Sequence, residues 1–561
     1  MMLELDRSRW TNHYDTGVPA SVEIPRIPLT RFLHDAAAAH PTRAALWSAR
    51  GSLSYQQLVG EVQRFSAVLA QQGVRAGDRV LVMLPNSLQQ VVAFYGTLWR
   101  GAVAVLSSPD YPPGVLESHL VDSAPRLAVI PHPANETMVA AIRGGGPEHI
   151  LFSSGREYTR TLRTFLRAAV GVVRPHRVRR RFLRWRALMR AAHDGFPLEP
   201  VDPDSPAVVI YTGGTTGAPM GVVLSHRALV ANAVQLRAWD PRMRDGEERF
   251  LGALPLCHAY GLSCCLNLSV LLAGTVILTG RWDPDRVLEL CTRFRPTLFP
   301  GIPSLYGALL ARPNLRSYRL SSIRACISGA APLPVEVQEG FEKVTRGRLV
   351  EGYGLTEAGP VTHANPFYGA RQSGSIGVPL PSTEARVICP ETGADLPDGK
   401  VGELVVRGPQ LMDGYWNNPE ASSRVLRDGW LHTGDMATQN RDGRFFLINR
   451  RREVLLIEGR DIFPRDIEEV LYEHPAVLEA AVAGWPPPAG GEAPFPVEEL
   501  HAYVVPRPGQ ELHANEVIEF CRRRLPPYLV PARVRRLDAL PRSRFGKLLR
   551  RELYSFEGYE S

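Results

Sequence analysis

The sequence YTGGTTGAPMGVVLSH, Tyr211 to His226, joins a short apolar run to a loop rich in glycine and threonine. The run AVVIYTGG (207–214) predicts a buried strand that ends where the loop begins. Glycines let backbone N–H groups approach phosphate oxygens, and threonine hydroxyls add donors. The spacing is not that of the GxxxxGK[ST] loop, and Met220 stands where a phosphate loop is expected to offer a lysine. Taken alone, the stretch fits a tight turn at least as well as a nucleotide site.

The strand that precedes this loop belongs to a repeating strand–helix pattern. The run 78–85 predicts a strand, 87–101 a helix and 102–108 the next strand. Further strands are predicted at 126–131, 207–214, 275–280, 297–301 and 323–330. This repetition is typical of an α/β protein whose parallel sheets are covered by helices. Such sheets bind ligands beyond the carboxyl ends of their strands, which is where YTGG, PGIPS and SGAAPLP occur.

The chain has 561 residues, which is too long for one hydrophobic core and predicts two to four domains. From about residue 374 the sequence changes to short strands and frequent turns, which predicts a β subdomain over 374–449. A mixed α+β pattern follows from about residue 450. We therefore expect a large domain over 1–449 and a small C-terminal domain over 450–561.

The cysteines and the N-terminus favour a reducing, cytoplasmic location. The seven cysteines include no CxxC pair, which favours free thiols over a disulfide scaffold or a zinc site. The first residues, MMLELDRSRW, carry no apolar core of a secretion signal. Gly252 to Gly280 has no charged residue, but its polar positions predict a buried helix of about ten residues and a strand rather than a membrane span.

The net charge of +8 is concentrated in one segment. Residues 156–190 hold twelve arginines and one glutamate, a local charge of +11. Apolar residues fall on one helical face over 162–173 and on a second face formed by Val178, Phe182, Trp185 and Met189. Basic amphipathic helices bind anionic membranes, so 156–193 predicts either peripheral membrane association or a helical hairpin docked on the protein itself. No nucleic-acid-reading motif accompanies the charge.

Four more motifs carry candidate functional residues. EGYGLTEAG (351–359) offers a tyrosine that can stack on a base, a threonine that can donate to a phosphate, and a glutamate that can bind Mg²⁺. WLHTGDMA (430–437) offers Asp435 for ribose hydroxyls. NRRREVLLIEG (449–459) offers Arg450, and LPRSRFGKLLRREL (540–553) places Lys547 after a glycine. Each motif alone also fits a structural role.

In this order and spacing the motifs resemble the adenylate-forming superfamily of acyl-CoA synthetases, luciferases and adenylation domains. The resemblance covers nearly the whole chain and includes LPLCHAYGL (254–262), SGAAPLP (328–334) and GELVVRGPQLMDGYWNNPE (402–420). The opening segment and the basic insertion look most like bacterial long-chain fatty acyl-CoA ligases. The resemblance implies a large domain of two αβ lobes plus a β subdomain, and a small mobile C-terminal domain.

The resemblance also implies the reaction: a carboxylate attacks the α-phosphate of ATP to give an acyl-AMP, and a thiol then takes the acyl group. Such chemistry depends on positioning and charge stabilisation. ATP, Mg²⁺ and coenzyme A are the implied cofactors. The residues implied to bind ATP or AMP are Thr212, Gly213, Gly214, Thr215, Thr216, Gly217, Gly329, Ala330, Ala331, Tyr353, Gly354, Asp435 and Arg450.

The resemblance assigns catalytic roles to Lys547, Thr356, Glu357 and His258. Lys547 stabilises charge at the reacting groups, Thr356 contacts the α-phosphate, and Glu357 is the metal ligand. In the C-terminal part, Glu453 stands at the hinge position and Gly459 at the thiol channel. Met220 and Leu456 stand where many members have lysine, which puts the rate of each half-reaction in doubt.

Two features that this sequence lacks indicate which class of acid is activated and which thiol accepts the acyl group. The block PLCHAYG has Cys257 and His258 but no carboxylate to hold an ammonium group, so an α-amino acid is not expected. The apolar GLSCCLNL would suit a hydrocarbon wall. No carrier domain follows in this sequence, so coenzyme A is the expected acceptor, with a separate acyl carrier protein as the alternative. The sequence does not fix the oligomeric state.

Three functions therefore remain open from the sequence. The first is a coenzyme A ligase for medium- or long-chain fatty acids. The second is a ligase for an aryl or polyketide-derived acid that delivers to a carrier protein or an amine. The third is a catalytically weakened relative that binds an acyl group or a nucleotide.

Overall fold

The computed structural model describes residues 8–134, 146–158, 181–193, 195–212, 219–450, 453–457, 460–487, 495–507, 509–542 and 548–557. The chain divides into two compact units. The large unit comprises Met1–Glu384 and Arg407–Leu431, and the small unit comprises Ala385–Val406 and His432–Ser561. The boundary near residue 450 that the sequence suggests stays a prediction.

The central sheet of the large unit has eight strands in the order β18-β9-β8-β4-β3-β5-β6-β7. Pairing is parallel from β8 to β7, whereas β9 runs antiparallel to both β8 and β18. The bounds are β3 (Arg79–Val82), β4 (Val103–Leu106), β5 (Leu127–Pro131), β6 (His149–Ser153), β7 (Arg181–Arg184), β8 (Pro206–Thr212), β9 (Met220–Ser225) and β18 (Gly414–Tyr415). The predicted parallel α/β architecture is confirmed.

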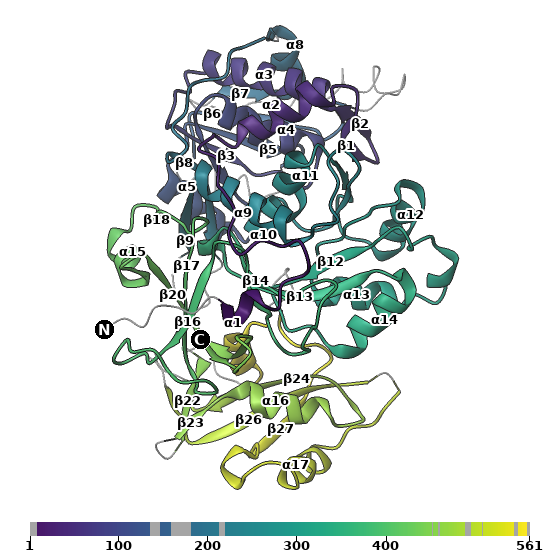
Figure 1. The fold of residues 1–561 in the computed structure, drawn as a ribbon, viewed down its shortest axis with the longest axis vertical. Coiled ribbons are helices and arrows are strands. Elements are labelled where there is room, and N and C mark those ends of the chain that lie inside the picture. The colour runs from purple at the N-terminus through teal and green to yellow at the C-terminus, as the bar shows by residue number, and fades with distance from the viewer. Residues whose placement is uncertain are drawn as a thin grey trace. The chain divides into compact units, whose positions relative to one another are not determined.

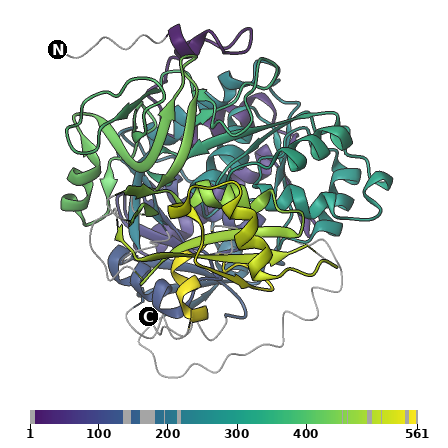
Figure 2. The same cartoon turned by 90° about the horizontal axis from the view of Figure 1, so that it is seen from below.

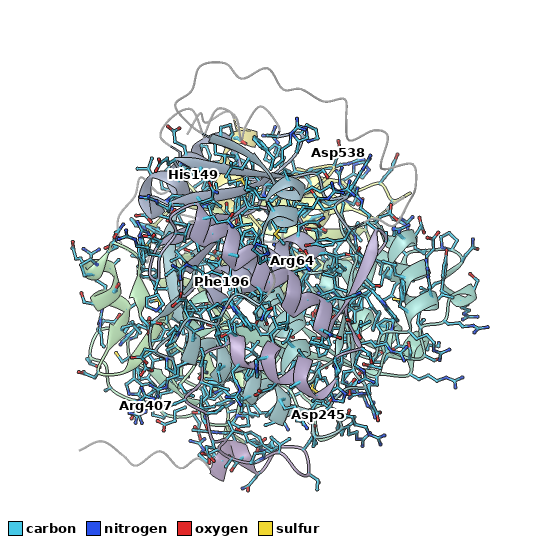
Figure 3. All side chains as sticks on the ribbon, turned by 90° about the horizontal axis from the view of Figure 1, so that it is seen from above. Arg64, His149, Phe196, Asp245, Arg407 and Asp538 are labelled. Atoms are coloured by element: carbon cyan, nitrogen blue, oxygen red, sulfur yellow. The ribbon has the colours of Figure 1, made fainter. Side chains whose placement is uncertain are left out.

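Helices cover this sheet in Figure 1, and local signals explain where they begin. Ser54 and Gln57 form a capping box at the start of α3, and the Ser87 side chain accepts from Gln90 N at the start of α4. Figure 3 looks onto α3, which carries Arg64. Outside the segment 252–280, the α-helices in the described part of this unit are α1 (Ser8–Thr11), α2 (Thr30–Ala39), α3 (Tyr55–Gln71), α4 (Leu88–Trp99), α5 (Pro113–Ser123), α8 (Trp185–Ala191), α9 (His226–Trp239), α12 (Pro284–Phe294), α13 (Pro303–Leu310), α14 (Val335–Thr345) and α15 (Pro419–Val425).

Two further four-stranded sheets complete the large unit, in the orders β10-β11-β1-β2 and β12-β13-β14-β15. Leu298, in the predicted strand 297–301, bridges Phe250 of one sheet and Ala325 of the other. The bounds are β1 (Ala44–Ser48), β2 (Gly51–Ser54), β10 (Arg249–Gly252), β11 (Thr275–Leu278), β12 (Ala325–Ser328), β13 (Arg348–Gly354), β14 (Val361–Ala364) and β15 (Val378–Pro379).

The uncharged segment 252–280 lies inside the large unit, as predicted. It forms α10 (Ala259–Gly261), the π-helix η1 (Leu262–Asn267), α11 (Leu268–Leu271) and β11. All six residues of the π-helix are buried. Among the described residues, no helix is both long enough and apolar enough to cross a bilayer.

The basic insertion differs from its predicted form over 181–191. The prediction of a helical face through Phe182 is wrong, because Arg181–Arg184 forms β7 and pairs in parallel with β6. Trp185 and Met189 belong to α8 and are buried, and the Trp185 ring stacks on Phe65 of α3 with centroids 5.0 Å apart. This end of the insertion docks on the protein itself. The predicted face over 162–173 and Val178 lie outside the described residues.

The described residues of the small unit form antiparallel and mixed β-structure with the α-helices α16, α17 and α18, shown in green to yellow in Figure 2. Its C-terminal core is the sheet β24-β26-β27, packed by α16 and α17. The bounds are β16 (Glu384–Ile388), β17 (Gly402–Arg407), β20 (Trp430–Gln439), β21 (Phe445–Arg450), β22 (Leu455–Ile457), β23 (Arg460–Ile462), α16 (Pro464–Tyr472), β24 (Val477–Trp485), β25 (Phe495–Pro496), β26 (Glu499–Pro506), α17 (Ala514–Arg522), β27 (Arg533–Arg536) and α18 (Arg550–Leu553).

Candidate active site

The predicted phosphate loop lies between two neighbouring strands of the central sheet. Thr212, the last residue of β8, is paired with Met220, the first residue of β9, and its Oγ1 donates to the Met220 carbonyl at 3.4 Å. Gly213, Gly214, Thr215, Thr216 and Gly217 lie outside the described residues. The chain therefore leaves and re-enters the sheet at adjacent positions, at the carboxyl end of β8, where α/β proteins bind ligands.

The residue before Thr212 is held by contacts that the sequence did not reveal. The Tyr211 hydroxyl donates to Asp122 Oδ2 at 2.6 Å, and its ring stacks on His119 with centroids 4.0 Å apart. His119 in turn contacts Ser107 Oγ through Nδ1 at 3.1 Å. These partners are some 90 to 100 residues away in sequence, so no local pattern could have identified them. They fix the base of the loop to α5 and to Ser107, the residue that follows β4.

The residues predicted to enclose adenine come together at the ends of two parallel strands. β12 and β13 are parallel neighbours with Ser328 opposite Glu351. The Gly329–Ala331 turn and Tyr353 both come just after this pair, so they lie at the same edge of the sheet. Gly329 N donates to the Gly301 carbonyl at 3.1 Å, and Ala330 adopts a left-handed φ of 67°. Tyr353 is buried, and Gly354 approaches Pro360 so closely that a Cβ would lie 2.0 Å from its carbonyl oxygen.

Thr356 and Glu357 lie on a short 3₁₀ turn, η3 (Thr356–Ala358), directly after β13. Three hydrogen bonds from two distant segments hold this turn. Met412 N donates to the Glu357 carbonyl at 2.9 Å, Ser263 Oγ of the π-helix donates to the Gly359 carbonyl at 2.9 Å, and the Tyr415 hydroxyl donates to Glu357 Oε1 at 3.0 Å. The turn is therefore fixed by contacts from residues far away in sequence.

Strand β18 connects this turn to the phosphate loop. Tyr415 pairs with Val222, and Trp416 N donates to the Gly221 carbonyl at 2.6 Å, so β18 lies along the strand that emerges from the loop. The motif 402–420 belongs to the family resemblance, but the sequence predicts no role for its Tyr415. Its contact with Glu357 depends on long-range strand pairing, which a single sequence does not reveal.

Glu357 has the properties that a single protein ligand of Mg²⁺ requires. Its carboxylate is half-buried, and among the described residues it forms no ion pair. The described residues include no group of three or more His, Cys, Asp or Glu side chains arranged to hold a metal ion. Mg²⁺ is commonly bound by one or two carboxylates together with substrate phosphates, so Glu357 fits a cation that arrives with ATP.

His258 lies immediately before α10 in the block that was predicted to border the acid. Burial lowers the pKa of His258 to about 4, so its imidazole is neutral at pH 7. Its ring meets Tyr111 edge-on with centroids 6.4 Å apart. Cys257, beside it, is buried, and burial raises the pKa of its thiol to about 12. His258 can therefore donate or accept a hydrogen bond but supplies no positive charge.

The remaining predicted residues belong to the small unit. Asp435 is buried in β20, where it is paired with Arg450 of β21, and its backbone N–H donates to Thr433 Oγ1 at 3.1 Å. This pairing brings the two predicted ribose residues together. Glu453 Oε2 accepts from Arg550 Nε at 3.3 Å. Gly459 and Lys547 lie outside the described residues.

Comparisons with known proteins identify the family of the chain. Residues 33–416 match the family described as AMP-binding enzyme, and residues 466–547 match the AMP-binding enzyme C-terminal domain. The chain is 38% identical to a long-chain-fatty-acid–CoA ligase of Bacillus subtilis, over 98% of each chain. It is 35% identical to a feruloyl-CoA synthase of an Amycolatopsis species, over 90% of this chain and 93% of that protein.

Among solved structures, ATP-bound MatB from Rhodopseudomonas palustris superposes with a TM-score of 0.80 at 28% identity, covering 95% of this chain and 99% of that chain. The expected fold, a large N-terminal α/β domain with a smaller C-terminal domain, is confirmed by this likeness. The family match covers well over half of the sequence. The chain therefore belongs to the AMP-binding enzyme family, the adenylate-forming enzymes that its motifs resemble.

Proposed function

We propose that the protein activates a medium- or long-chain fatty acid with ATP to acyl-AMP and then forms the coenzyme A thioester. The observation that carries the proposal is that β18 joins the base of the phosphate loop to the Glu357 turn, next to the strand ends that carry the adenine residues. A triphosphate, its cation and a base would thus be bound by neighbouring segments of one unit. The B. subtilis relative supports a fatty acid as the substrate.

The block around His258 supports an acid without an ammonium group. His258 is neutral at pH 7 because burial lowers its pKa, and the block has no carboxylate. The π-helix that follows presents buried leucines and cysteines, which suit an apolar acyl chain. A neutral imidazole can orient a carboxylate by a hydrogen bond without neutralising it, so the carboxylate keeps its nucleophilic charge.

An aryl acid is the second candidate for the substrate. It is favoured by the 35% identity with a feruloyl-CoA synthase. The two candidates share the first half-reaction and differ in the shape of the acid pocket. Both relatives are coenzyme A ligases by name, which supports coenzyme A as the acceptor; an acyl carrier protein or an amine is the alternative acceptor.

Each chemical role in the proposal falls to one group of this chain. Thr212 and Gly213–Gly217 hold the phosphates, Thr356 contacts the α-phosphate and Glu357 holds Mg²⁺. The cation, when bound, neutralises charge on the phosphates. Asp435 and Arg450 take the ribose, and Lys547 stabilises the charge that develops as the carboxylate attacks the α-phosphate. Glu453 and Gly459 serve the hinge and the thiol channel.

The composition gives additional support for Lys547. The chain has only three lysines, Lys343, Lys400 and Lys547, among 65 basic Lys and Arg residues. Lys343 and Lys400 are exposed. A lysine where the chain otherwise uses arginine fits a role that needs a compact ammonium group rather than a planar guanidinium.

The test is ATP–pyrophosphate exchange with a panel of acids that includes palmitate, decanoate, ferulate and benzoate. We expect exchange with the fatty acids and, by mass spectrometry, the matching acyl-CoA once coenzyme A is added. Lys547→Ala should lower exchange by about 10²-fold or more, whereas Lys343→Ala and Lys400→Ala serve as controls without effect. Exchange with no acid of the panel by folded protein would contradict the enzyme proposal, and exchange with ferulate alone would favour the aryl alternative.

Peripheral membrane association is proposed only for the part of the insertion before β7. Trp185 and Met189 are buried against the protein and are not available to a bilayer. Flotation with anionic vesicles should therefore depend on 159–180 and be unchanged by Arg186→Gln and Arg190→Gln. Equal flotation after deletion of 159–180 would exclude this role for the segment.

A further inference from the structure

The Tyr415 hydroxyl lies at the junction between the phosphate loop and the proposed cation ligand. It donates to Glu357 Oε1 at 3.0 Å. Among the described residues, Glu357 Oε2 accepts no hydrogen bond, so one carboxylate oxygen is held and the other is available. Tyr415 is 9% exposed, which keeps water from competing for the bond.

Hydrogen bonds fix the backbone on both sides of Tyr415, so the position of its hydroxyl is fixed as well. Tyr415 N donates to Ser422 Oγ at 2.8 Å. On the other side, Asp413 N donates to the Val223 carbonyl at 3.0 Å, and Trp416 N donates to the Gly221 carbonyl. Because Met412 N also binds the Glu357 carbonyl, the same short segment holds both the backbone and the side chain of Glu357.

A hydroxyl donor suits this task better than a cation would. An arginine or lysine at this position would neutralise the carboxylate and compete with a divalent ion, whereas a tyrosine hydroxyl orients the carboxylate and leaves its charge intact. Partners of this kind orient ligating carboxylates and commonly change metal affinity by ~10–100-fold when they are removed.

We propose that Tyr415 is a positioning residue for cation binding: it holds the Glu357 carboxylate so that the ATP-bound divalent ion meets a preoriented oxygen, and it couples that oxygen to the strand that leaves the phosphate loop. The proposal rests on the proposed role of Glu357 as the metal ligand. Tyr415 touches neither the reacting carboxylate nor the α-phosphate in this assignment.

The experiment measures cation binding directly and does not depend on turnover. Mn²⁺ binding to the full-length protein is followed by electron paramagnetic resonance with a saturating non-hydrolysable ATP analogue and no acid. Tyr415→Phe, which removes only the hydroxyl, should weaken Mn²⁺ binding ~10-fold, and the Mg²⁺ concentration for half-maximal ATP–pyrophosphate exchange should rise by a similar factor. Binding of the cation-free analogue should stay unchanged.

Tyr158→Phe is the matched control, because the Tyr158 hydroxyl donates to Glu61 at 2.8 Å at the base of the insertion. It removes an equivalent tyrosine–glutamate bond and should leave Mn²⁺ binding as in wild type. Wild-type Mn²⁺ affinity in Tyr415→Phe would overturn the proposal, as would equal weakening by Tyr158→Phe.

Glu357→Gln separates this inference from the proposed function. If Glu357→Gln weakens Mn²⁺ binding and Tyr415→Phe adds nothing in that background, the two residues act as one unit, as proposed. If Glu357→Gln leaves Mn²⁺ binding unchanged, the metal role of Glu357 and the positioning role of Tyr415 are both wrong. Failure of the acid panel in the exchange assay would contradict the proposed function without changing the Mn²⁺ result.

Discussion

Each unit contains an arginine held between two carboxylates from distant parts of the sequence. In the large unit, Arg324 pairs with Asp240 and with Glu248, the latter at 2.7 Å. In the small unit, Arg550 pairs with Glu453 at 3.3 Å and with Glu468. Burial alone would lower the pKa of each arginine, but the two carboxylate charges outweigh it and raise the pKa in both clusters.

The two clusters differ in their surroundings. The carboxylates of Asp240 and Glu248 are 0% and 4% exposed, and Glu248 also accepts from Arg244 N and Thr297 Oγ1. Those of Glu468 and Glu453 are 10% and 25% exposed, and Arg550 follows Lys547 by three residues. The same pattern of charge therefore stabilises the interior of one unit and, in the other, lies beside the segment that carries the proposed catalytic lysine.

Arg324→Met should have the largest effect on stability. It would leave two almost fully buried carboxylates without their cation, at a cost of about 3–5 kcal/mol in the free energy of unfolding. We expect a much lower urea midpoint for the large unit, with unchanged kcat for the protein that remains folded. An unchanged midpoint would mean that the backbone and Thr297 donors alone satisfy the cluster.

Arg550→Met should cost less stability but more activity. Its carboxylates are more exposed, so we expect a loss of about 2–3 kcal/mol in the small unit, together with a fall in exchange rate greater than the unfolded fraction explains. Urea unfolding and exchange are measured on the same sample. Arg522→Met is the control, because the Arg522–Glu519 pair is exposed and should contribute less than about 0.5 kcal/mol. Full activity in the folded fraction of Arg550→Met would mean that the Arg550 cluster stabilises the small unit but does not contribute to activity.

Acid should destabilise the large unit more than the small unit. Burial lowers the pKa of His119, His226 and His258 to about 4, and all three lie in the large unit. Unfolded histidine has a pKa near 6.5, so the unfolded chain binds more protons and stability is lost as pH falls from about 6.5 to 4. Each histidine adds a slope of about 1.4 kcal/mol per pH unit.

Urea titrations at pH 7, 6 and 5 would measure that slope. His226→Gln should reduce it by one histidine's share, since its Nδ1 accepts a backbone hydrogen bond from Leu29 N and must be neutral to do so. In the small unit, burial also lowers the pKa of His474, so a weaker dependence of the same sign is expected there. Equal slopes for both units would refute the contrast.

Met220→Lys should have the smallest effect. It tests the end of the phosphate loop, which belongs to neither the Arg324 cluster nor the Arg550 cluster. Met220 is half-buried at the end of the phosphate loop, and a lysine there would add one cation near the outgoing pyrophosphate. We expect the KM for ATP to fall or the adenylation rate to rise about threefold to tenfold, which corresponds to one modest charge-assisted contact. A loss of activity would indicate that the loop is packed around methionine.

The sequence predicts the strands and helices of the large unit well where apolar periodicity is strong. The strand 78–85 and the helix 87–101 appear as β3 and α4, because both are strongly apolar runs: every residue of α4 and the last three residues of β3 are buried. The helical face through Phe182 fails because pairing with β6 outweighs a local helical pattern over 181–184. The π-helical turn in 262–267 was also not predicted, since no residue type specifies it.

The candidate site was predicted as motifs, not as a set of contacts. Thr212, Tyr353, Thr356 and Glu357 fall on neighbouring segments because β8, β9, β18 and β13 bring them there. The side chains that hold them, such as Asp122 for Tyr211 and Tyr415 for Glu357, were not found because their partners are 58 to 89 residues away. Long-range pairing sets these contacts, and single-sequence patterns carry no information about it.

Gly414 precedes Tyr415, so the hydrogen bond from Tyr415 to Glu357 also depends on the residue at position 414. Its φ of 147° is rare for other residues, and a Cβ there would lie 2.9 Å from Ser422 Oγ, the atom that anchors Tyr415 N. A substitution such as Gly414→Ala would therefore touch neither nucleotide nor acid, yet it would displace the tyrosine beside it. The defect would appear as a higher Mg²⁺ requirement of the enzyme, and the affected residue would not be recognised from a map of ligand contacts.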